Sequence, residues 1–592
     1  MDLKELNKLQ KSQLAHILIS IPESKDIVLD ADLTKPLDRV AGVSFLKEHG
    51  VDKIFKLEPS QKSLPGCSRR IYFVRPRMVT MKYIADHINN EMAKGEKRSY
   101  KIVLVPRKLH VCQMILESEG VLGHVTIDEF PLELFTLDSD ILSLELPEVF
   151  TSYYLDDDTT WLQTVASSLV SLQGLFGKIP NVYAIGKGSR MVYDLMQTLF
   201  ETHKERKETK FNIGQLFIID RDIDLVSPLC SPMTYEALLD DTFGIDCSMI
   251  TFDPTIIGDG KEVKLLLTNQ DEIYSQIRDR HFSNVFSYLS GKAKDLQAVY
   301  NKKNNLKTVG DMKEFVANEL RQLKQQQKLL ATHISACESI MKYKAQTDFE
   351  EFLKTEQTLL EGTGIKENMA YIEECIHKQF SPILTLRLVC LLSLTQEGLN
   401  PKDYKSLKTQ FLHSHGFEHL VTFFNLKKLG MFTEQELVQG GVRSLVRKSN
   451  YATLNRKLGL VPKQSDDYDL KTPTDMSYVF SGAYSPLPCK LVEQIITRDT
   501  LIGLEDVGRM CGGLHSDLKY KIRGFGGPGK VPPVIDPAMK VILVYFVGGC
   551  TYSEITALRF LAKSHGLKIY IATTAIVTSN SLLEGLMEKR AR

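Results

Sequence analysis

The chain has 592 residues, 43% of them apolar and 25% charged, which is ordinary for a soluble globular protein and leaves room for roughly four domains. Its 74 basic residues almost balance its 73 acidic residues. A chain whose charges nearly cancel has little overall electrostatic attraction for nucleic acids or membrane surfaces. We therefore expect neither to be its main activity.

Cysteine spacing and hydrophobicity favour a cytoplasmic location. The ten cysteines include no Cys-x-x-Cys pair, and the N-terminal stretch from Met1 to Leu6 lacks the apolar core of a signal peptide. The most apolar helical stretch, Ile383 to Leu394, contains Arg387 and is shorter than the ~20 residues of a membrane span. We expect reduced thiols and membrane association only through partners.

Residues 1–135 alternate short apolar runs with helical patterns. This alternation predicts a mostly parallel α/β sheet in an N-terminal domain over 1–135. The predicted strands are 26–33, 51–56, 70–74 and 101–105, and the predicted helices are 78–94 and 108–119.

A second α/β region begins near Trp161. Its predicted strands are 181–186 and 215–219. The last 53 residues hold two further strands, 541–547 and 567–572, around one helix. Because two parallel strands rarely stand alone, we expect them to complete the earlier sheet. The prediction is a discontinuous domain over 136–246 and 476–592.

An acidic turn follows the buried strand that ends near Ile219. Asp220, Asp222 and Asp224 would share one face, with Arg221 opposite, if the strand continued. The pattern is similar to the start of haloacid-dehalogenase phosphatases, where a strand-end Asp is the nucleophile. However, Asp224 stands where Thr or Val is expected, and the second acidic motif is not evident. We favour a structural junction in which Asp220 and Asp224 cap and pair, with Arg221 as counter-ion.

The insertion is predicted to be helical, as two parts over 247–362 and 363–475. One long helix carries a coiled-coil-like seam at Val316, Leu320, Leu323, Gln327, Leu330, Ile334, Cys337 and Met341. Residues 348–360 could fold back against it after a turn at 342–347. The hairpin could be buried in its own domain, but Gln327 interrupts the seam, and a polar residue there often specifies a register or a partner.

A short helix around Tyr451 is predicted next. Tyr451, Leu454 and Leu458 fall on one face, and cations including Arg447 flank the segment. A core-facing stripe is one interpretation. A peripheral interface is the other, because Tyr and Arg are favoured at protein interfaces.

The loop from Gly524 to Val531 matches Gly-x-Gly-x-x-Gly and Gly-x-x-x-x-Gly-Lys. A phosphate loop needs a helix after it, whereas Lys530 is followed by Val531-Pro-Pro533. We expect a surface loop, with no cofactor and no metal bound by the chain.

Two segments carry a family resemblance. The first is Asp220-Arg221-x-x-Asp224, followed by Pro228 and Thr234-Tyr235. The second is Gly548-Gly549-x-Thr551-x-x-Glu554, in which Thr551 and Glu554 have capping-box spacing. Both resemble motifs of the Sec-1/Munc-18-like (SM) family, class C vacuolar protein sorting type. Further segments in family order are 36–47, 73–76, 281–286, 371–376 and 478–487.

This resemblance implies a fold and a role. The fold would be α/β plus all-α, an SM-type three-domain arch with two parallel-sheet α/β domains, the second discontinuous, and a large helical insertion. The role would be non-enzymatic: regulation of vesicle docking and SNARE-mediated membrane fusion in late endosome and lysosome trafficking. The expected location is cytoplasmic, with peripheral association to late endosomes, lysosomes and recycling endosomes.

Partners also follow from the resemblance. A syntaxin-type SNARE is expected between the concave side of the N-terminal domain and the helical insertion. The candidates for the contact on the insertion are Leu323, Gln327, Leu330, Lys342, Tyr343 and Lys344. A class C scaffold subunit of the spermatogenesis-defective protein 39 (VIPAR) type is expected at Arg447, Tyr451, Leu454 and Leu458. Two alternatives stay open: a metal-dependent phosphatase or nucleotide hydrolase, and a structural adaptor without SNARE binding.

Overall fold

The computed structural model describes most of the chain. The described residues are 2–59, 64–202, 211–254, 262–302, 320–346, 348–435, 449–463, 469–498, 503–519 and 537–588. By internal contacts the chain forms two compact units. Unit 1 comprises 1–145, 160–178 and 192–212, and unit 2 comprises 146–159, 179–191 and 213–592. The division of the chain into four parts stays a prediction.

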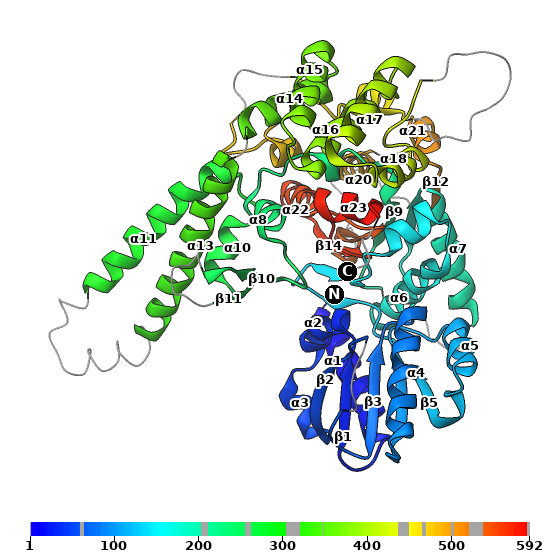
Figure 1. Ribbon diagram of the computed structural model, residues 1–592. Coiled ribbons are helices and arrows are strands. Elements are labelled where there is room, and N and C mark those ends of the chain that lie inside the picture. The colour runs from blue at the N-terminus through cyan, green and yellow to red at the C-terminus, as the bar shows by residue number, and fades with distance from the viewer. Residues whose placement is uncertain are drawn as a thin grey trace. The chain divides into compact units, whose positions relative to one another are not determined.

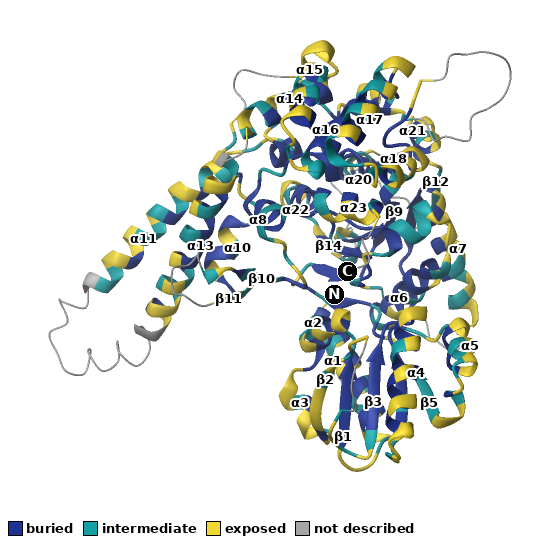
Figure 2. Cartoon of the chain, viewed as in Figure 1, coloured by how far each residue is buried: buried dark blue, intermediate teal, exposed yellow. Residues whose placement is uncertain are grey.

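Unit 1 is built on a five-stranded parallel sheet in the order β2-β1-β3-β4-β5 (Figure 1). Its strands are β1 (Lys25–Leu29), β2 (Val51–Lys56), β3 (Arg69–Val74), β4 (Ser99–Leu104) and β5 (Val125–Glu129). The central strands are buried, as the dark blue of β1 and β3 shows (Figure 2). The parallel sheet expected from the alternating pattern is therefore present.

One predicted strand boundary in unit 1 is wrong. The strand expected over 26–33 ends at Leu29, and a helix begins at Ala31. Leu33, Leu37 and Val40 recur at helical spacing and are all buried, so the period changes earlier than the apolar run suggested.

Helices and short strands precede, separate and follow the strands of this sheet along the chain. The remaining elements before β8 are α1 (Leu3–Ile19), α2 (Ala31–Val40), α3 (Val43–Glu48), α4 (Met78–Ala93), α5 (His110–Ser118), η1 (Leu122–His124), β6 (Phe135–Thr136), β7 (Ile141–Ser143), η2 (Thr151–Leu155) and α6 (Thr160–Phe176). Of these, η2 belongs to unit 2 and is a π-helical turn.

Unit 2 contains a second sheet, in which β12, β8, β9, β13 and β14 are consecutive neighbours. Their bounds are β8 (Asn181–Ile185), β9 (Gln215–Asp220), β12 (Leu514–Leu518), β13 (Val541–Val547) and β14 (Lys568–Thr573). β13 pairs in parallel with β9 on one side and with β14 on the other, as expected for the C-terminal strands. The sequence does not predict β12, an antiparallel strand at the edge, because its central residues His515-Ser-Asp517 contain no apolar run.

A mostly helical insertion separates β9 from β13. Its elements before the long hairpin are η3 (Arg221–Ile223), η4 (Ser227–Leu229), α8 (Tyr235–Phe243), β10 (Met249–Phe252), β11 (Val263–Leu266), α10 (Glu272–Ile277) and η5 (Phe282–Asn284). The helices that follow are α11 (Val285–Lys302), α13 (Leu320–Gln346), α14 (Phe349–Glu361), α15 (Ile365–His377), α16 (Pro382–Thr395), α17 (Pro401–His415), α18 (His419–Lys428) and α19 (Tyr451–Leu458).

The chain then returns to the sheet. The last elements are η8 (Met476–Phe480), α20 (Leu487–Thr497), α21 (Glu505–Met510), η9 (Pro537–Lys540), α22 (Tyr552–His565) and α23 (Ser579–Leu586), while α7 (Lys187–Thr202) follows β8 earlier in the chain. The predicted class, α/β with a large helical insertion, is confirmed.

Candidate functional site

Asp220 is a fully enclosed carboxylate at the end of β9. It accepts hydrogen bonds from the backbone N–H groups of Gly188 and Ser189, both at 2.7 Å, and from Ser189 Oγ at 2.6 Å. A Cβ at Gly186, where φ is +111°, would lie 2.3 Å from the Asp220 carboxylate. Burial, and then the charge of Asp222, raise the pKa of Asp220 to about 7. Asp220 therefore fastens the start of α7 to β9 and is not presented to a substrate.

Asp224 has a similar structural role. Its carboxylate accepts hydrogen bonds from Val226 N, Ser227 N, Ser227 Oγ and Leu487 N at 2.6–3.0 Å. These contacts close the turn after β9 and tie it to the start of α20.

Arg221 pairs with a carboxylate other than the neighbouring aspartates that the sequence predicts. Its Nη1 atom donates to Glu554 at 2.7 Å, and its Nε and Nη2 atoms donate to the backbone carbonyl of Asp224. Glu554 also closes the predicted capping box with Thr551 at the start of α22. The strand does not continue through the acidic run either, because η3 begins at Arg221, so the expected alternation of faces is wrong. No local sequence signal identifies Glu554 as the partner of Arg221.

The helical hairpin pairs different helices from those predicted. α13 packs beside α11, and the two lie side by side in Figure 1. Residues 348–360, expected to fold back on the seam, instead form α14, which packs mainly on α15 and α16. The sequence does not distinguish these two pairings, because α11 and α14 both carry apolar faces.

Only part of the predicted seam on α13 faces the core of this hairpin. Leu323, Leu330 and Cys337 are buried, whereas Gln327 is half-buried and Met341 is exposed. Val316 lies outside the described residues. Leu323 and Leu330 thus match the interpretation of a hairpin buried in its own domain, and Gln327 sits at its margin.

A polar contact holds α13 in place. His333 lies between Asp271, at 3.0 Å from Nε2, and the Tyr235 hydroxyl, at 2.8 Å from Nδ1. Although burial opposes the change, the hydrogen bond and the charge of His333 lower the pKa of Asp271. All three side chains are buried, so this contact fixes the rotation of α13 about its axis.

The candidates Lys342, Tyr343 and Lys344 lie within α13, at its end nearest α14, and not in the turn predicted over 342–347. Lys342 and Tyr343 are exposed, while Lys344 pairs with Asp241 at 3.1 Å. Tyr343 and Lys344 border a cavity of about 310 Å³. It is also lined by Phe349, Phe352, Tyr371, Phe380 and Arg387.

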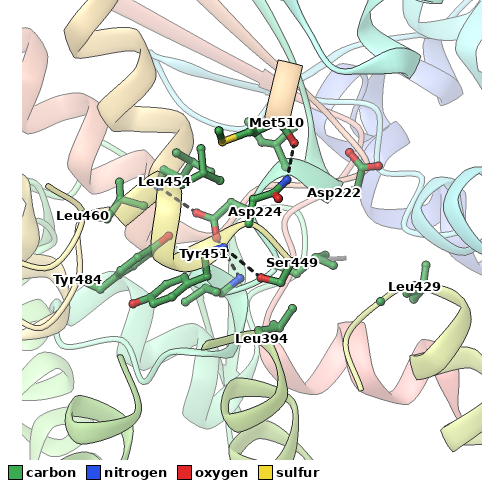
Figure 3. A pocket seen from close by; sticks show the side chains of 16 residues that line it. Asp222, Asp224, Leu394, Leu429, Ser449, Tyr451, Leu454, Leu460, Tyr484 and Met510 are labelled. Atoms are coloured by element: carbon green, nitrogen blue, oxygen red, sulfur yellow. Dashed lines mark hydrogen bonds between the residues drawn. The ribbon is translucent and has the colours of Figure 1, made fainter. Parts of the chain in front are cut away.

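The helix α19 has its apolar stripe inward. Tyr451, Leu454 and Leu458 are 6–7% exposed, and the Tyr451 hydroxyl donates to the Leu360 carbonyl at 2.7 Å. Figure 3 shows Tyr451 and Tyr484 beside Asp224 around a cavity of about 70 Å³. Of the two interpretations of this stripe, the core-facing one holds for these three side chains, and the peripheral one does not. Whether α19 binds a scaffold stays a prediction.

Two predicted features lie outside the described residues. They are Arg447 and the glycine-rich loop from Gly524 to Val531. Within the described ranges, no helix is both long and apolar enough to cross a membrane.

The comparisons with known proteins cover almost the whole chain. The model of the Sec1 family matches residues 25–585. The chain belongs to the Sec1 family. This Sec1-family chain is 44% identical to vacuolar protein sorting-associated protein 33B of Rattus norvegicus over 613 residues, which cover 100% of this chain and 98% of the relative.

Solved Sec1-type structures share the fold. The Unc18–syntaxin 1 complex from Monosiga brevicollis has a TM-score of 0.61 at 17% identity and covers 98% of this chain and 99% of its own. The SM protein Vps45 in complex with the Qa SNARE Tlg2 has a TM-score of 0.59 at 16% identity, with 99% and 98% coverage. The Sec1-type fold expected from the sequence motifs is confirmed.

Proposed function

We propose that this chain is a non-enzymatic regulator of vesicle docking and SNARE-mediated membrane fusion in late endosome and lysosome trafficking. The observation that carries the proposal is the 44% identity to vacuolar protein sorting-associated protein 33B along the entire chain. The solved structures of Unc18 with syntaxin 1 and of Vps45 with a Qa SNARE support SNARE helices as the ligand class.

The α11–α13 hairpin is the proposed SNARE-binding element. An exposed helix pair can accept a further helix along its length. On α13, Gln327 at the margin of the packed face and the exposed Tyr343 are the accessible candidates, whereas Leu323 and Leu330 support the hairpin from inside.

Binding of the full chain to a panel of soluble syntaxin-type SNARE fragments tests this assignment. Gln327→Leu should alter affinity or discrimination within the panel, because it removes the polar break in the seam. Gln325→Leu, at an exposed position two residues earlier, is the matched control and should leave binding unchanged. A higher melting temperature for Gln327→Leu with unchanged binding to every fragment would assign Gln327 to the hairpin core alone.

A class C scaffold subunit of the VIPAR type is the second proposed partner. The inward stripe of α19 would hold the helix, and its outward residues Ala452 and Arg456 would meet the scaffold. Purification of the chain from cytosol, followed by identification of stoichiometric partners, separates this regulator from an adaptor without SNARE binding. An adaptor would retain the scaffold and lose every SNARE.

Hydrolytic activity is the remaining alternative. Asp220 is 1% exposed and its oxygens accept three hydrogen bonds, so an in-line attack on a phosphate has no approach. We expect the purified chain to match buffer in assays with magnesium and ATP, GTP or a generic phosphate ester. Turnover that Asp220→Asn abolishes would establish an enzyme.

A further inference from the structure

The cavity of about 310 Å³ beside Tyr343 is lined by residues of α13, α14, α15 and α16. This volume is at the lower end of the range for small-molecule sites in proteins. Tyr343 is 43% exposed, which places it where the cavity meets solvent. The lining includes five aromatic residues, Tyr343, Phe349, Phe352, Tyr371 and Phe380. The chain therefore has a concave, mostly apolar site in its helical insertion.

The aromatic rings in this cavity are available for stacking. Tyr371 and Phe380 are half-buried, and neither ring contacts another aromatic ring in the described part of the chain. The Phe349 ring has the Lys344 ammonium over it, at 4.4 Å from the ring centroid. Flat aromatic groups stack favourably on such rings. A planar ligand would find aromatic partners here that the chain itself leaves unused.

The polar part of the cavity contains a buried guanidinium ion with a donor to spare. Arg387 is 2% exposed, and its Nε atom donates to the Leu229 carbonyl at 3.0 Å. Its Nη2 atom donates to Ser231 Oγ at 2.9 Å and to Glu356 at 3.1 Å. Its Nη1 atom donates no hydrogen bond to any described residue, and the Asp241 carboxylate is 3.9 Å away. Because Arg387 and Asp241 both line the cavity, a ligand oxygen there can accept from Nη1.

The charges around this donor cancel. Lys344 lies 3.1 Å from Asp241, and Arg387 lies 3.1 Å from Glu356. All four side chains are at most 14% exposed, so a ligand with a full charge would enter a poorly solvated site without a free counter-ion. Asp348 also lines the cavity, but it is exposed, and water and salt screen its charge. An uncharged hydrogen-bond acceptor fits these surroundings better than an anion or a cation.

We propose that this cavity binds a small uncharged molecule with a planar aromatic body and a carbonyl-type oxygen. The oxygen accepts a hydrogen bond from Arg387 Nη1, and the ring stacks on Tyr371 or Phe380. The bound molecule contacts α13, α14, α15 and α16 together and so stabilises this part of the folded insertion. The proposal does not rest on SNARE or scaffold binding, and of the proposed SNARE contacts the site includes only Tyr343.

Three probes that share a naphthalene ring test the fit and the charge argument on the full chain. They are naphthamide, which is neutral, naphthoate, which is anionic, and naphthylmethylamine, which is cationic, all substituted at position two of the ring. In titrations followed by saturation-transfer difference NMR, naphthamide should bind with a Kd on the order of 1 mM or tighter, as expected for about 13 non-hydrogen atoms. Each charged probe should bind at least about tenfold more weakly.

Two substitutions place the binding in the cavity. Tyr371→Leu keeps apolar bulk but removes the ring, so it should weaken naphthamide binding about fivefold. Tyr288→Leu, at a half-buried tyrosine of α11 that does not line the cavity, is the matched control and should change nothing. Arg387→Lys keeps the positive charge beside Glu356 but removes the planar fork of donors, so it should weaken naphthamide about tenfold. Thermal unfolding establishes that each variant is folded, and if Arg387→Lys is not, Tyr371→Leu decides the test.

Several outcomes would overturn the proposal. They are the absence of saturable naphthamide binding, equal affinity for the three probes, and an affinity that Tyr371→Leu leaves unchanged. Tighter binding of naphthoate or naphthylmethylamine would contradict the requirement for an uncharged ligand. Competitive displacement of naphthamide by a syntaxin-type SNARE fragment would assign the cavity to a side chain of that partner and not to a small molecule.

Discussion

Arg221 is a guanidinium ion with no access to solvent. Glu554 lies 333 residues further along the chain and is the carboxylate nearest its Nη1 atom. Both side chains are 0% exposed, so neither charge is stabilised by water. Despite burial, which opposes it, the Glu554 charge raises the pKa of Arg221 and keeps it protonated. The pair joins the turn after β9 to the start of α22.

Glu554→Gln should therefore destabilise the chain by about 3–5 kcal/mol, because it leaves a buried cation without its counter-ion. Urea denaturation measures this loss as a fall in the unfolding midpoint. Asp506→Asn is the control, since its partner Lys457 and Asp506 itself are 35% and 59% exposed. That variant should change stability by less than about 1 kcal/mol. Equal losses of stability in the two variants would show that the buried ion pair contributes no more to stability than the exposed one.

His281 gives the chain a pH dependence in the acidic range. Its ring nitrogens meet Ser283 Oγ at 2.8 Å and Ser481 Oγ at 2.9 Å, and burial lowers its pKa from 6.5 to about 4. The unfolded chain therefore binds a proton more readily than the folded chain between these two values. Stability is fully present above pH 6.5 and falls by up to about 3 kcal/mol as the pH drops towards 4.

Melting temperatures between pH 7.5 and 4.5 check this expectation. His281→Gln should show a flatter decline than the unmodified chain across this interval, whatever its stability at pH 7.5. His413→Gln, at an exposed position, should decline like the unmodified chain. Parallel curves for His281→Gln and the unmodified chain would contradict a depressed pKa at His281.

At the scale of elements, the orientation of α19 is a choice that the sequence leaves open. Its stripe packs inward, and its outward residues are Ala452, Arg456 and Lys457. A substitution at Tyr451 is consequently a core substitution. If such a variant failed to capture the scaffold, the cause could equally be unfolding of the chain or loss of a direct contact.

Tyr451→Asp should cost several kcal/mol, because it places a carboxylate where the ring now packs near Tyr484. Tyr451→Phe should cost only about 1 kcal/mol, the value of the hydroxyl bond to Leu360. Thermal unfolding distinguishes the two. A Tyr451→Asp variant that melts within a few degrees of the unmodified chain would restore the surface interpretation.

Arg456→Glu tests the scaffold proposal without disturbing the core. It should reduce capture of the scaffold subunit while leaving the melting temperature unchanged, because Arg456 is exposed on α19. Arg509→Glu, at a 76% exposed side chain on α21, serves as the control and should bind normally. Normal capture by Arg456→Glu would remove α19 from the interface.

On the scale of the whole molecule, unit 2 depends on its C-terminal segment. β13 lies between β9 and β14, and the side chains from Ile542 to Val547 are all 0% exposed. Deleting residues 541–592 would uncover β9 along its length and remove Glu554. Because each buried large side chain contributes roughly 1.5–3 kcal/mol, the loss exceeds the usual net stability of a domain.

The truncated chain, residues 1–540, should therefore aggregate or lose cooperative unfolding. Size-exclusion chromatography and thermal unfolding of the two chains measure this. A deletion of residues 589–592 is the matched control and should behave like the full chain, since it leaves β13, β14 and α23 intact. A soluble truncated chain with a single sharp transition would show that the C-terminal strands are a separate module.

The sequence by itself determined the local elements and the family. Val541–Val547 forms a strand with the predicted bounds, because a continuous apolar run has few alternatives to burial in a sheet. Val51–Lys56 also has the predicted bounds, although Val51 is its only buried residue. The capping box of Thr551 and Glu554 is equally local, since three residues separate its partners. The family motifs can be recognised for the same reason, because each is a contiguous stretch of sequence.

Only the tertiary structure decided which surfaces meet. Arg221 pairs with Glu554 and not with the three aspartates that are close to it in sequence. The main partner of α13 is α11 and not α14, and Tyr451 is buried. Each choice depends on residues far apart in the chain, and several partners of equal chemistry compete for each position. Periodicity fixes which side chains share a face of a helix. It carries no information on whether that face meets the core or the solvent, because burial is set by the neighbours that the fold supplies.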